Sequence, residues 1–513
     1  MNGAESLIRT LVAGGLEVCF ANPGTSEIHI VAALDKVPEM RAVLTLFEGV
    51  ATGAADGYAR MAGKPAWTLL HLGPGLANGS ANLHNAGRAQ VPLLNVVGQH
   101  ATNHLRFDTP LTSDIEGVAR PYSKWLRTSS ATSTVGHDAA DAIVAARTAP
   151  GQIATLIVPA DLAWSDGGVI AEARAIPRPM MPSSSSIEEA VTMLRSGKRT
   201  AILLSGNALY GEGLTLAGRV AAATNSKLFA PYPVSRMERG AGRPAVERVA
   251  YVLEQGIEQF KEFGQLILVG AEAPVAYFAY PGRNSEFVGP GCKIHRLAGA
   301  GKDLVGALSS LADAFPSVSA QPMQQLERPN APTGDITLSG LAATVGALLP
   351  EGAIVVDESM TSGRGMMAAT KGAPPHDWLG NTGGSIGIAL PLAVGAAVAS
   401  RERRVLCLSA DGSGMYTLQA LWTMAREGLN VTTVVFANRS YGVLKREFSY
   451  LGVGEPGPAA AMLFDIGHPD LDWVHLAKGM GVPASRVHSL EDFKSALQAG
   501  FSGNGPSLIE VPL

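Results

Sequence analysis

Short apolar runs alternate with longer small-residue or amphipathic segments along the first third of the chain. The apolar runs predict strands, and the longer segments predict helices over 5–13 and 49–62. The predicted strands cover residues 18–20, 42–47, 67–71 and 93–98. Strands of this length separated by helices are typical of βαβ units, which build a parallel sheet.

The same alternation occurs twice more downstream. Further strands are predicted at 201–205, 266–270, 354–356, 405–409, 432–437 and 507–511. Two stretches rich in Pro or Ser, 177–186 and 316–333, interrupt the alternation and mark boundaries. The pattern therefore predicts an α/β protein with three doubly wound parallel-sheet domains. Their expected ranges are 1–176, 187–315 and 334–513.

Composition supports large buried cores. Hydrophobic residues make up 46% of the 513 residues and charged residues 16%, which excludes a disordered chain. The longest apolar run, 383–400, is interrupted by Gly387, Pro391 and Gly395, so a buried helix is expected there and no membrane association. Residues 1–13 lack a basic region followed by an apolar core, and we expect a cytoplasmic protein without a signal peptide.

Charge and cysteine content narrow the function further. Lys and Arg number 40 against 44 Asp and Glu, a net charge of −4, and no basic block occurs. Nucleic acid is therefore not an expected partner. The three cysteines, Cys19, Cys292 and Cys407, are far apart and form no CxxC pair, so neither a zinc site nor a disulfide framework is indicated.

Two polar segments follow strands of the third domain. Strand 405–409 runs into Asp411, Gly412 and Ser413, and strand 432–437 runs into Asn438. The carboxyl ends of parallel strands are where open α/β sheets bind ligands. A carboxylate, an amide oxygen and a nearby carbonyl suit Mg²⁺, which completes its shell with phosphate oxygens and water. The competing interpretation is an ordinary turn in which Asp411 caps a helix.

This constellation resembles the diphosphate and Mg²⁺ motif of thiamine-diphosphate enzymes, with Ala410 and Ala437 in place of the usual Gly and Asn. The resemblance implies thiamine diphosphate and Mg²⁺ as cofactors. It implies Asp411, Asn438 and the backbone carbonyl of Ser440 as metal ligands. It also implies that five residues contact the cofactor: Asp411, Gly412, Ser413, Asn438 and Tyr441.

The first domain carries a second part of the resemblance. Segments 22–27, 47–51 and 55–59 are similar to the pyrimidine-binding domain of these enzymes, and Glu48 matches the glutamate that contacts the aminopyrimidine ring. There a carboxylic acid favours the imino tautomer, whose imine takes the proton from the thiazolium carbon. Without the resemblance, Glu48 would be interpreted as a surface or capping carboxylate.

Two further segments of the third domain match the family. Residues 383–391 resemble the segment whose bulky apolar residue supports the bent cofactor, which implies this role for Ile386. A packed helix start with Pro391 in an early turn is compatible with that role. Residues 357–362 follow a strand and look like a second phosphate-side loop, with Thr361 as the candidate contact.

The substrate side is similar to two members of the superfamily, the acetolactate synthase catalytic subunit and benzoylformate decarboxylase. Strand 67–71 ends on His71, where the decarboxylase has a histidine facing its substrate. The second histidine of the decarboxylase is missing from 274–281, where Phe278 or Ala279 stands. We therefore favour carboligation of a 2-keto acid, with decarboxylation as the alternative. A core histidine without a catalytic role remains open for His71, as does a pocket or solvent position for His100 and His104.

Cofactors, assembly and rival classes complete the prediction. Segment 231–243 lacks the Gly-rich pattern associated with FAD in the synthases, so no FAD is expected. No strand is followed by GxGxxG with a later acidic residue, which disfavours a dinucleotide-dependent oxidoreductase. The presence of Glu48, Asp411 and Asn438 disfavours a non-catalytic relative. In the superfamily the cofactor lies between domains of two chains, which implies a homodimer or homotetramer.

Overall fold

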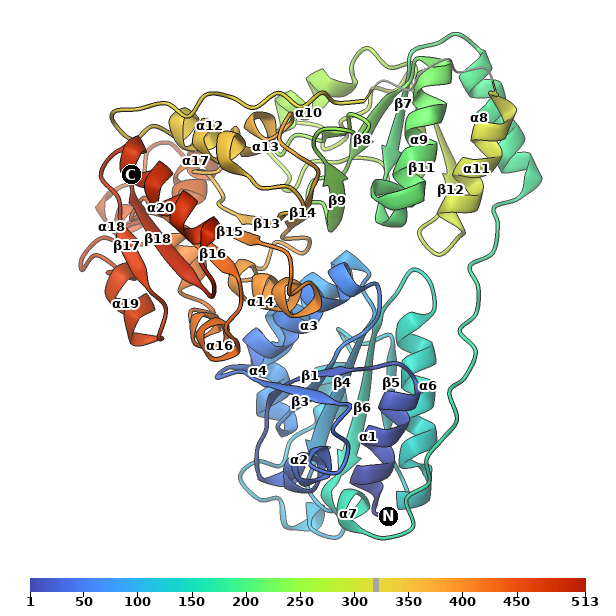
Figure 1. Ribbon diagram of the computed structural model, residues 1–513. Coiled ribbons are helices and arrows are strands. Elements are labelled where there is room, and N and C mark those ends of the chain that lie inside the picture. The colour runs from blue at the N-terminus through green and yellow to red at the C-terminus, as the bar shows by residue number, and fades with distance from the viewer. Residues whose placement is uncertain (317–322) are drawn as a thin grey trace.

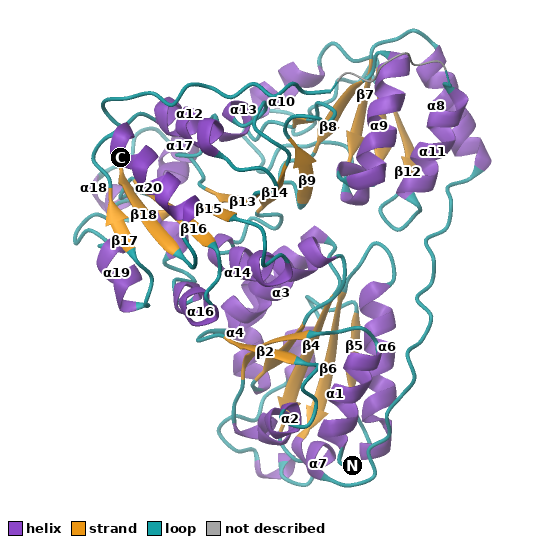
Figure 2. Ribbon diagram, in the orientation of Figure 1, coloured by secondary structure: helices purple, strands orange, loops and turns teal. Residues whose placement is uncertain are grey.

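A computed structural model describes residues 1–316 and 323–513 and arranges them in three α/β domains (Figure 1). Each domain is built around one sheet with helices against it (Figure 2). The predicted fold class, three domains with predominantly parallel sheets, is confirmed. Part of the second predicted linker, residues 317–322, lies outside the described residues.

The first sheet is entirely parallel and has the strand order β2-β1-β3-β4-β6-β5. Its strands are β1 Val18–Asn22, β2 Arg41–Leu44, β3 Trp67–Leu70, β4 Leu93–Gln99, β5 Trp125–Thr128 and β6 Ile153–Pro159. Its helices are α1 Gly3–Ala13, α2 Ile28–Leu34, α3 Glu48–Ala62, α4 Leu72–Ala89, α5 Ile115–Ala119, α6 Val135–Arg147 and α7 Ala160–Trp164. The strand expected over 42–47 ends at Leu44, because Phe47 is already the N-cap of α3.

The central sheet has the order β10-β8-β7-β11-β12, also parallel. Its strands are β7 Thr200–Leu204, β8 Lys227–Ala230, β10 Glu247–Arg248, β11 Gln265–Val269 and β12 Lys293–Ala298. Its helices are α8 Ser184–Arg195, α9 Gly211–Thr224, α10 Leu253–Phe260 and α11 Leu304–Ala314. Helix α8 begins inside the predicted linker 177–186, because the Ser183 hydroxyl caps it by accepting from the Ser186 N–H at 3.2 Å.

The third sheet has the order β17-β18-β16-β15-β13-β14-β9. Its strands are β9 Arg236–Arg239, β13 Ile354–Glu358, β14 His376–Gly380, β15 Val405–Ala410, β16 Val431–Ala437, β17 Ala484–Arg486 and β18 Ser507–Pro512. Its helices are α12 Leu338–Leu348, α13 Met366–Ala369, α14 Ala389–Ala399, α15 Asp411–Gly414, α16 Ala420–Glu427, α17 Gly442–Tyr450, α18 Pro458–Met462, α19 Trp473–Gly479 and α20 Leu490–Ser502.

Strand β9 departs from the division by sequence. It lies inside the range assigned to the central domain, yet it pairs antiparallel with β14 at the edge of the third sheet. The sequence pattern did not predict this strand, because Arg236, Glu238 and Arg239 are charged and form no apolar run. The boundaries 1–176, 187–315 and 334–513 remain our proposal, with β9 as the strand that crosses them.

Helices α3 and α14 join the first and third domains (Figure 1). Their contact is close because glycines face it: a Cβ on Gly57 would lie 2.1 Å from the Leu392 carbonyl oxygen, and one on Gly395 would lie 1.8 Å from that of Ala54. The apolar residues around this junction form one core that includes side chains from both domains. Helix α14 is buried almost throughout, as expected for 383–400.

None of the helices that the structure describes combines the length and the hydrophobicity needed to cross a bilayer.

Candidate cofactor site

Glu48 is the first residue of α3 and directly follows the short turn after β2. It is 8% exposed, and the Asn78 side-chain amide donates to its carboxylate at 3.1 Å. A helix N-terminus favours a negative charge through the unpaired N–H groups of its first turn. Glu48 is thus a buried carboxyl group held in one orientation, and a surface position is ruled out.

His71 lies at the carboxyl end of β3, in the N-cap position of α4. Its Nδ1 is 2.8 Å from Glu27 Oε2 and 3.1 Å from the Ser26 hydroxyl, and its side chain is 22% exposed. The Gly24 N–H donates to the same carboxylate oxygen of Glu27 at 2.8 Å. A carboxylate on one ring nitrogen fixes the tautomer and leaves the other nitrogen, Nε2, for proton transfer.

Ser26 and Glu27 lie in segment 22–27, for which the resemblance implied no individual residue role. Their position has a simple origin, because β1 and β3 are neighbours in the sheet and their carboxyl ends meet at one edge. His100 follows β4, the next strand, on the same edge. Burial lowers the pKa of His100, and the nearby imidazoles of His104 and His71 lower it further.

The third domain brings Asp411, Asn438 and Ser440 together. The Asp411 carboxylate is buried and accepts from the N–H groups of Gly412 at 2.8 Å and Arg439 at 2.7 Å, so it bridges the ends of β15 and β16. Asn438 Oδ1 accepts from the Ser440 N–H at 3.1 Å. The Ser440 hydroxyl donates to the Phe464 carbonyl at 3.0 Å, which leaves the backbone carbonyl of Ser440 as the candidate ligand atom.

Burial raises the pKa of Asp411, and the two backbone N–H donors oppose the shift. A buried carboxylate without a cation beside it is costly, and a divalent ion would offset that cost. One carboxylate, one amide oxygen and one carbonyl are hard oxygen donors of the kind Mg²⁺ prefers. The donor set present therefore fits the metal.

The surroundings also fit a diphosphate. A Cβ on Gly412 would lie 2.7 Å from the Tyr441 ring, so only glycine lets Tyr441 pack this closely against the backbone after Asp411. Ser413 is buried in the same short helix, α15. Thr361 comes from the loop after β13 and reaches the same place, since a Cβ on Gly442 would lie 3.2 Å from its hydroxyl oxygen.

Ile386 lies in the turn between β14 and α14, half-buried between two glycines with positive φ, Gly384 at +79° and Gly387 at +94°. A Cβ on Gly387 would lie 2.5 Å from Tyr416, so the turn packs directly against the segment after Asp411. The Thr417 hydroxyl donates to the Gly387 carbonyl at 2.7 Å. The turn carrying Ile386 and the segment carrying Asp411 thus form one packed unit.

Backbone strain supports this location of the site. Six non-glycine residues of the described chain have positive φ, and three of them end helices: Gln90, Asp108 and Asn225. The other three, Leu72, Met360 and Arg439, directly adjoin His71, Thr361 and Asn438. Such strain in bulky residues is uncommon and clusters at functional sites.

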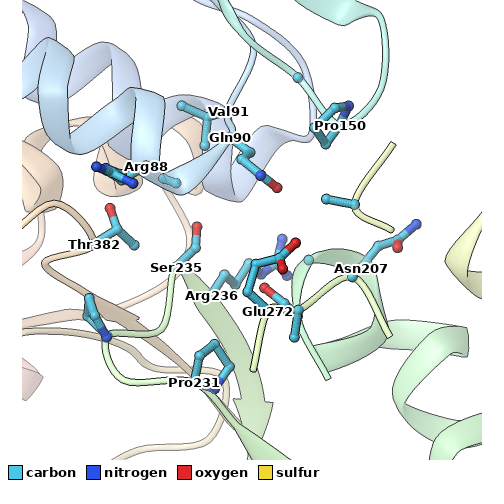
Figure 3. A pocket seen from close by; sticks show the side chains of 18 of the residues that line it. Arg88, Gln90, Val91, Pro150, Asn207, Pro231, Ser235, Arg236, Glu272 and Thr382 are labelled. Carbon is cyan, nitrogen blue, oxygen red and sulfur yellow. The ribbon is translucent and has the colours of Figure 1, made fainter. Parts of the chain in front are cut away.

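A separate cavity of about 610 Å³ lies between the first and central domains (Figure 3). Segment 231–236 forms part of its wall, together with Arg88 from α4 and Glu272 after β11. The cavity wall thus includes part of segment 231–243, which lacks the Gly-rich pattern associated with FAD in the synthases. The absence of FAD stays a prediction. Tyr277 also lines the cavity and reaches the cofactor side, since a Cβ on Gly384 would lie 2.0 Å from the Tyr277 hydroxyl.

Comparison with known proteins agrees with this geometry. Residues 1–118 match the family model of the thiamine pyrophosphate enzyme N-terminal TPP binding domain, and residues 362–511 match that of the C-terminal TPP binding domain. The chain is 53% identical, over 100% of its length and 99% of the relative's, to a protein of Mycobacterium tuberculosis described provisionally as an acetolactate synthase large subunit.

Two decarboxylases are more distant. Benzoylformate decarboxylase of Pseudomonas aeruginosa is 27% identical, over 97% of this chain and 96% of that one. The solved 4-hydroxybenzoylformate decarboxylase of Rhodococcus jostii RHA1 superposes with a TM-score of 0.87 at 24% identity, covering 100% of this chain and 99% of that one, which shows a shared fold.

The fold and the two domain matches define a thiamine-diphosphate-dependent enzyme. The chain belongs to the thiamine pyrophosphate enzyme family, and within it the chain is similar to the acetolactate synthase large subunits and to benzoylformate decarboxylase.

Proposed function

We propose that this enzyme forms a carbon–carbon bond next to the carbonyl of a 2-keto acid, using thiamine diphosphate and Mg²⁺. The observation that carries the proposal is the pair of half-sites: a buried glutamate at a helix start in the first domain, and a Mg²⁺-type oxygen set in the third. The high identity to a relative described as an acetolactate synthase subunit favours carboligation.

The third domain would hold the charged end of the cofactor. Asp411, Asn438 and the Ser440 carbonyl would bind Mg²⁺, and the short helix that begins at Asp411 would lie next to the diphosphate. Thr361 and Tyr441 flank this place, and Ile386 would support the bent form of the cofactor. When bound, thiamine diphosphate supplies the electron sink that the protein's own side chains lack.

The first domain would manage the protons. Glu48 would form a hydrogen bond with the ring nitrogen of the aminopyrimidine, and the amide of Asn78 keeps the carboxyl group in place. His71 gives or takes a proton at Nε2 next to the reacting carbon, since its Nδ1 is bound to Glu27. Glu27 holds the imidazole in one tautomer and orientation, which makes it a positioning residue.

Phe278 is the feature that favours carboligation over decarboxylation. By the resemblance, Phe278 or Ala279 stands where the decarboxylase has its second histidine, and Phe278 is an exposed aromatic side chain. With one imidazole instead of two, release of the product by protonation is less efficient, and a second carbonyl compound has time to react. The alternative, a benzoylformate-decarboxylase-like activity, predicts an aldehyde as the product.

Assembly follows from the same half-sites. The hydrogen bonds of Glu48 stay within the first domain, and those of Asp411 stay within the third. We propose a homodimer or homotetramer in which the cofactor lies between the first domain of one chain and the third domain of another. A fully active monomer in analytical sedimentation would rule this out. A cytoplasmic location stays a prediction.

The decisive experiment supplies the purified protein with thiamine diphosphate and Mg²⁺ and offers a panel of 2-keto acids, alone and with aldehyde or keto acceptors. Mass spectrometry of the products separates hydroxyketo products of carboligation from aldehydes. Failure to bind thiamine diphosphate at all would refute the proposal, and aldehyde as the sole product would establish the alternative.

A further inference from the structure

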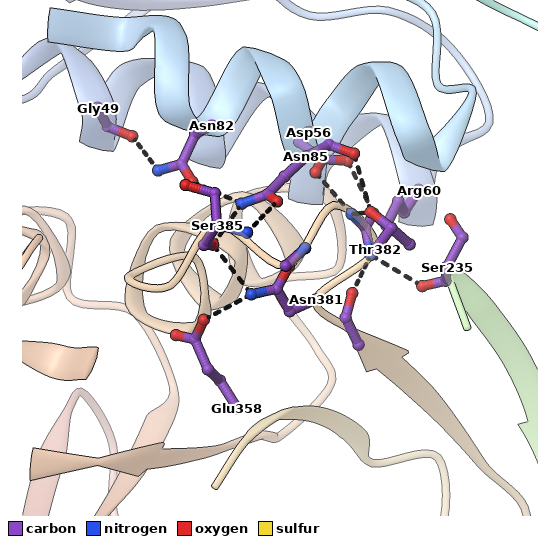
Figure 4. A network of polar contacts seen from close by, with 12 residues as sticks. Gly49, Asp56, Arg60, Asn82, Asn85, Ser235, Glu358, Asn381, Thr382 and Ser385 are labelled. Atoms are coloured by element: carbon purple, nitrogen blue, oxygen red, sulfur yellow. Dashed lines mark hydrogen bonds and ion pairs between the residues drawn. The ribbon is translucent and has the colours of Figure 1, made fainter. Parts of the chain in front are cut away.

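Glu358, the last residue of β13, is a buried carboxyl group to which the proposed chemistry gives no role. It is 3% exposed. The Asn381 amide donates to its Oε1 at 2.9 Å, the Gly387 N–H lies 3.1 and 3.2 Å from its two oxygens, and the Ala389 N–H donates to Oε2 at 3.1 Å. Figure 4 shows Glu358 at the end of this network.

All these neighbours are donors, and the two oxygens of Glu358 accept from every one of them. Among the residues that the structure describes, no Lys, Arg or His side chain forms an ion pair with Glu358. Burying a carboxylate without a cation is unfavourable, and the amide donors offset part of that cost. A group of this kind holds its donors in a fixed geometry, because each donor that moves away leaves the charge less compensated.

The donors belong to the turn that carries Ile386. Gly387 follows Ile386 directly, and Asn381 lies at the start of the same turn. Glu358 therefore accepts hydrogen bonds from both ends of the turn. Asn381 also donates to the Ser385 carbonyl at 2.9 Å. The Glu358 carboxylate thus determines where Ile386 lies relative to the packed segment after Asp411.

The first domain holds the same turn from the other side (Figure 4). The Asn85 amide donates to the Ser385 carbonyl at 2.8 Å and to Asn82 Oδ1 at 3.0 Å. The Asn82 amide donates to the carbonyl of Gly49, the residue after Glu48, at 2.8 Å. An unbroken chain of hydrogen bonds therefore runs from the start of α3 to Glu358.

We infer that Glu358 is a positioning residue that fixes the Ile386 turn and so sets the affinity for the thiazolium side of the cofactor. This inference rests on the proposed function. The diphosphate and the metal are held by Asp411 and Asn438, which do not contact Glu358, so their binding is independent of it.

The test compares Glu358→Gln with the wild type and with Glu351→Gln, a control at an exposed glutamate of the same domain. Glutamine replaces one acceptor oxygen by an amino group that faces the N–H of Gly387 or Ala389. Calorimetry in Mg²⁺ should show the dissociation constant of thiamine diphosphate raised roughly tenfold in Glu358→Gln, with that of inorganic diphosphate changed by less than about twofold. Hydrogen exchange of residues 384–389 should be faster in this variant only.

Each outcome decides. If the wild type binds no thiamine diphosphate, the proposed function is refuted, and the positioning role of Glu358 falls with it. A wild type that binds it, with Glu358→Gln equal in affinity and exchange, overturns the inference alone, and so does an equal loss of both ligands, which indicates general destabilisation. If Glu358→Gln does not fold, Asn381→Ala removes one donor and should show the same selective loss, smaller in size; wild-type values there would overturn the inference.

Discussion

The two halves of the candidate site, one in the first domain and one in the third, differ in the chemical groups that they present. The first-domain half consists of titratable side chains, Glu27, Glu48 and His71, each at the end of a strand or the start of a helix. The third-domain half offers backbone groups and oxygen ligands around Asp411 and Asn438. On the proposed function, this difference separates proton transfer from anchoring between the domains, so we expect that each can be removed without the other.

Charge is handled differently in the two halves. In the first, Glu27 meets an imidazole that becomes a cation when protonated, and Glu48 meets one amide. In the third, the Asp411 carboxylate accepts from two backbone N–H groups, which remain donors at every pH. Fixed donors suit binding of a constant charge, and titratable partners suit a proton that has to move.

The largest effect should come from the anchoring half. Asp411→Ala removes the carboxylate proposed to hold Mg²⁺, so cofactor binding and turnover should both fall by roughly 10³-fold or more, as for loss of a metal that tethers a phosphate. Calorimetry with thiamine diphosphate and Mg²⁺ measures the binding. Asp335→Ala, an exposed carboxylate in the same domain, is the control and should behave as wild type. Tight cofactor binding by Asp411→Ala in the presence of a chelator would contradict the metal assignment.

Glu48→Gln should separate chemistry from anchoring. Glutamine keeps the shape and the contact to Asn78 but is a poor acid toward the ring nitrogen. Exchange of the thiazolium C2 proton, followed by NMR, should slow by roughly 10²-fold or more while the cofactor stays bound. Unchanged exchange would remove Glu48 from the mechanism and with it the division of labour between the two halves.

His71→Ala should lower turnover by roughly 10²-fold at unchanged cofactor affinity, the usual scale for proton-transfer catalysis. Glu27→Gln keeps the imidazole but weakens the contact that orients it, so a smaller loss, roughly tenfold, is expected. Steady-state kinetics with product analysis measures both. A normal rate and product ratio in His71→Ala would return His71 to a purely structural role.

The sequence predicted the local elements well where one strong pattern governs them. The strands that end near Asp411 and Asn438 and the helix after Glu48 follow from apolar runs bounded by polar and glycine residues. Glu48 and Asp411 could be singled out because family motifs mark them, and the structure gives both buried positions with defined donors.

Other features depend on contacts between distant segments, which periodicity does not encode. Strand β9 pairs with β14, which lies roughly 140 residues later in the sequence. Because β9 contains charged residues, it does not form the apolar run that predicts a strand. Glu27 acquires its importance only because β1 and β3 are neighbours. The donors around Glu358 come from residues 381–389, and a buried carboxylate at a strand end looks like an ordinary loop residue until they are in place.

The smallest effect concerns Glu358 and stability. Burial raises the pKa of Glu358 from its ordinary 4.5 to about 7, against the opposing effect of its amide donors. Between these values the folded state binds a proton that the unfolded state has lost, so the stabilisation is full below pH 4.5 and disappears as pH rises through 7.

Relative to Glu358→Gln, which cannot titrate, the wild-type apoprotein should therefore lose on the order of 1–3 kcal/mol of unfolding free energy between pH 5 and pH 8. The buried thiol of Cys407 beside it stays neutral throughout, because burial and the Glu358 charge raise its pKa well above the ordinary value. Urea unfolding followed by tryptophan fluorescence measures the difference, and Glu351→Gln should follow the wild type at every pH. Parallel curves for wild type and Glu358→Gln would mean that the donors of the third domain keep Glu358 ionised across this range, and the anchoring half would then contain no group that titrates near neutrality.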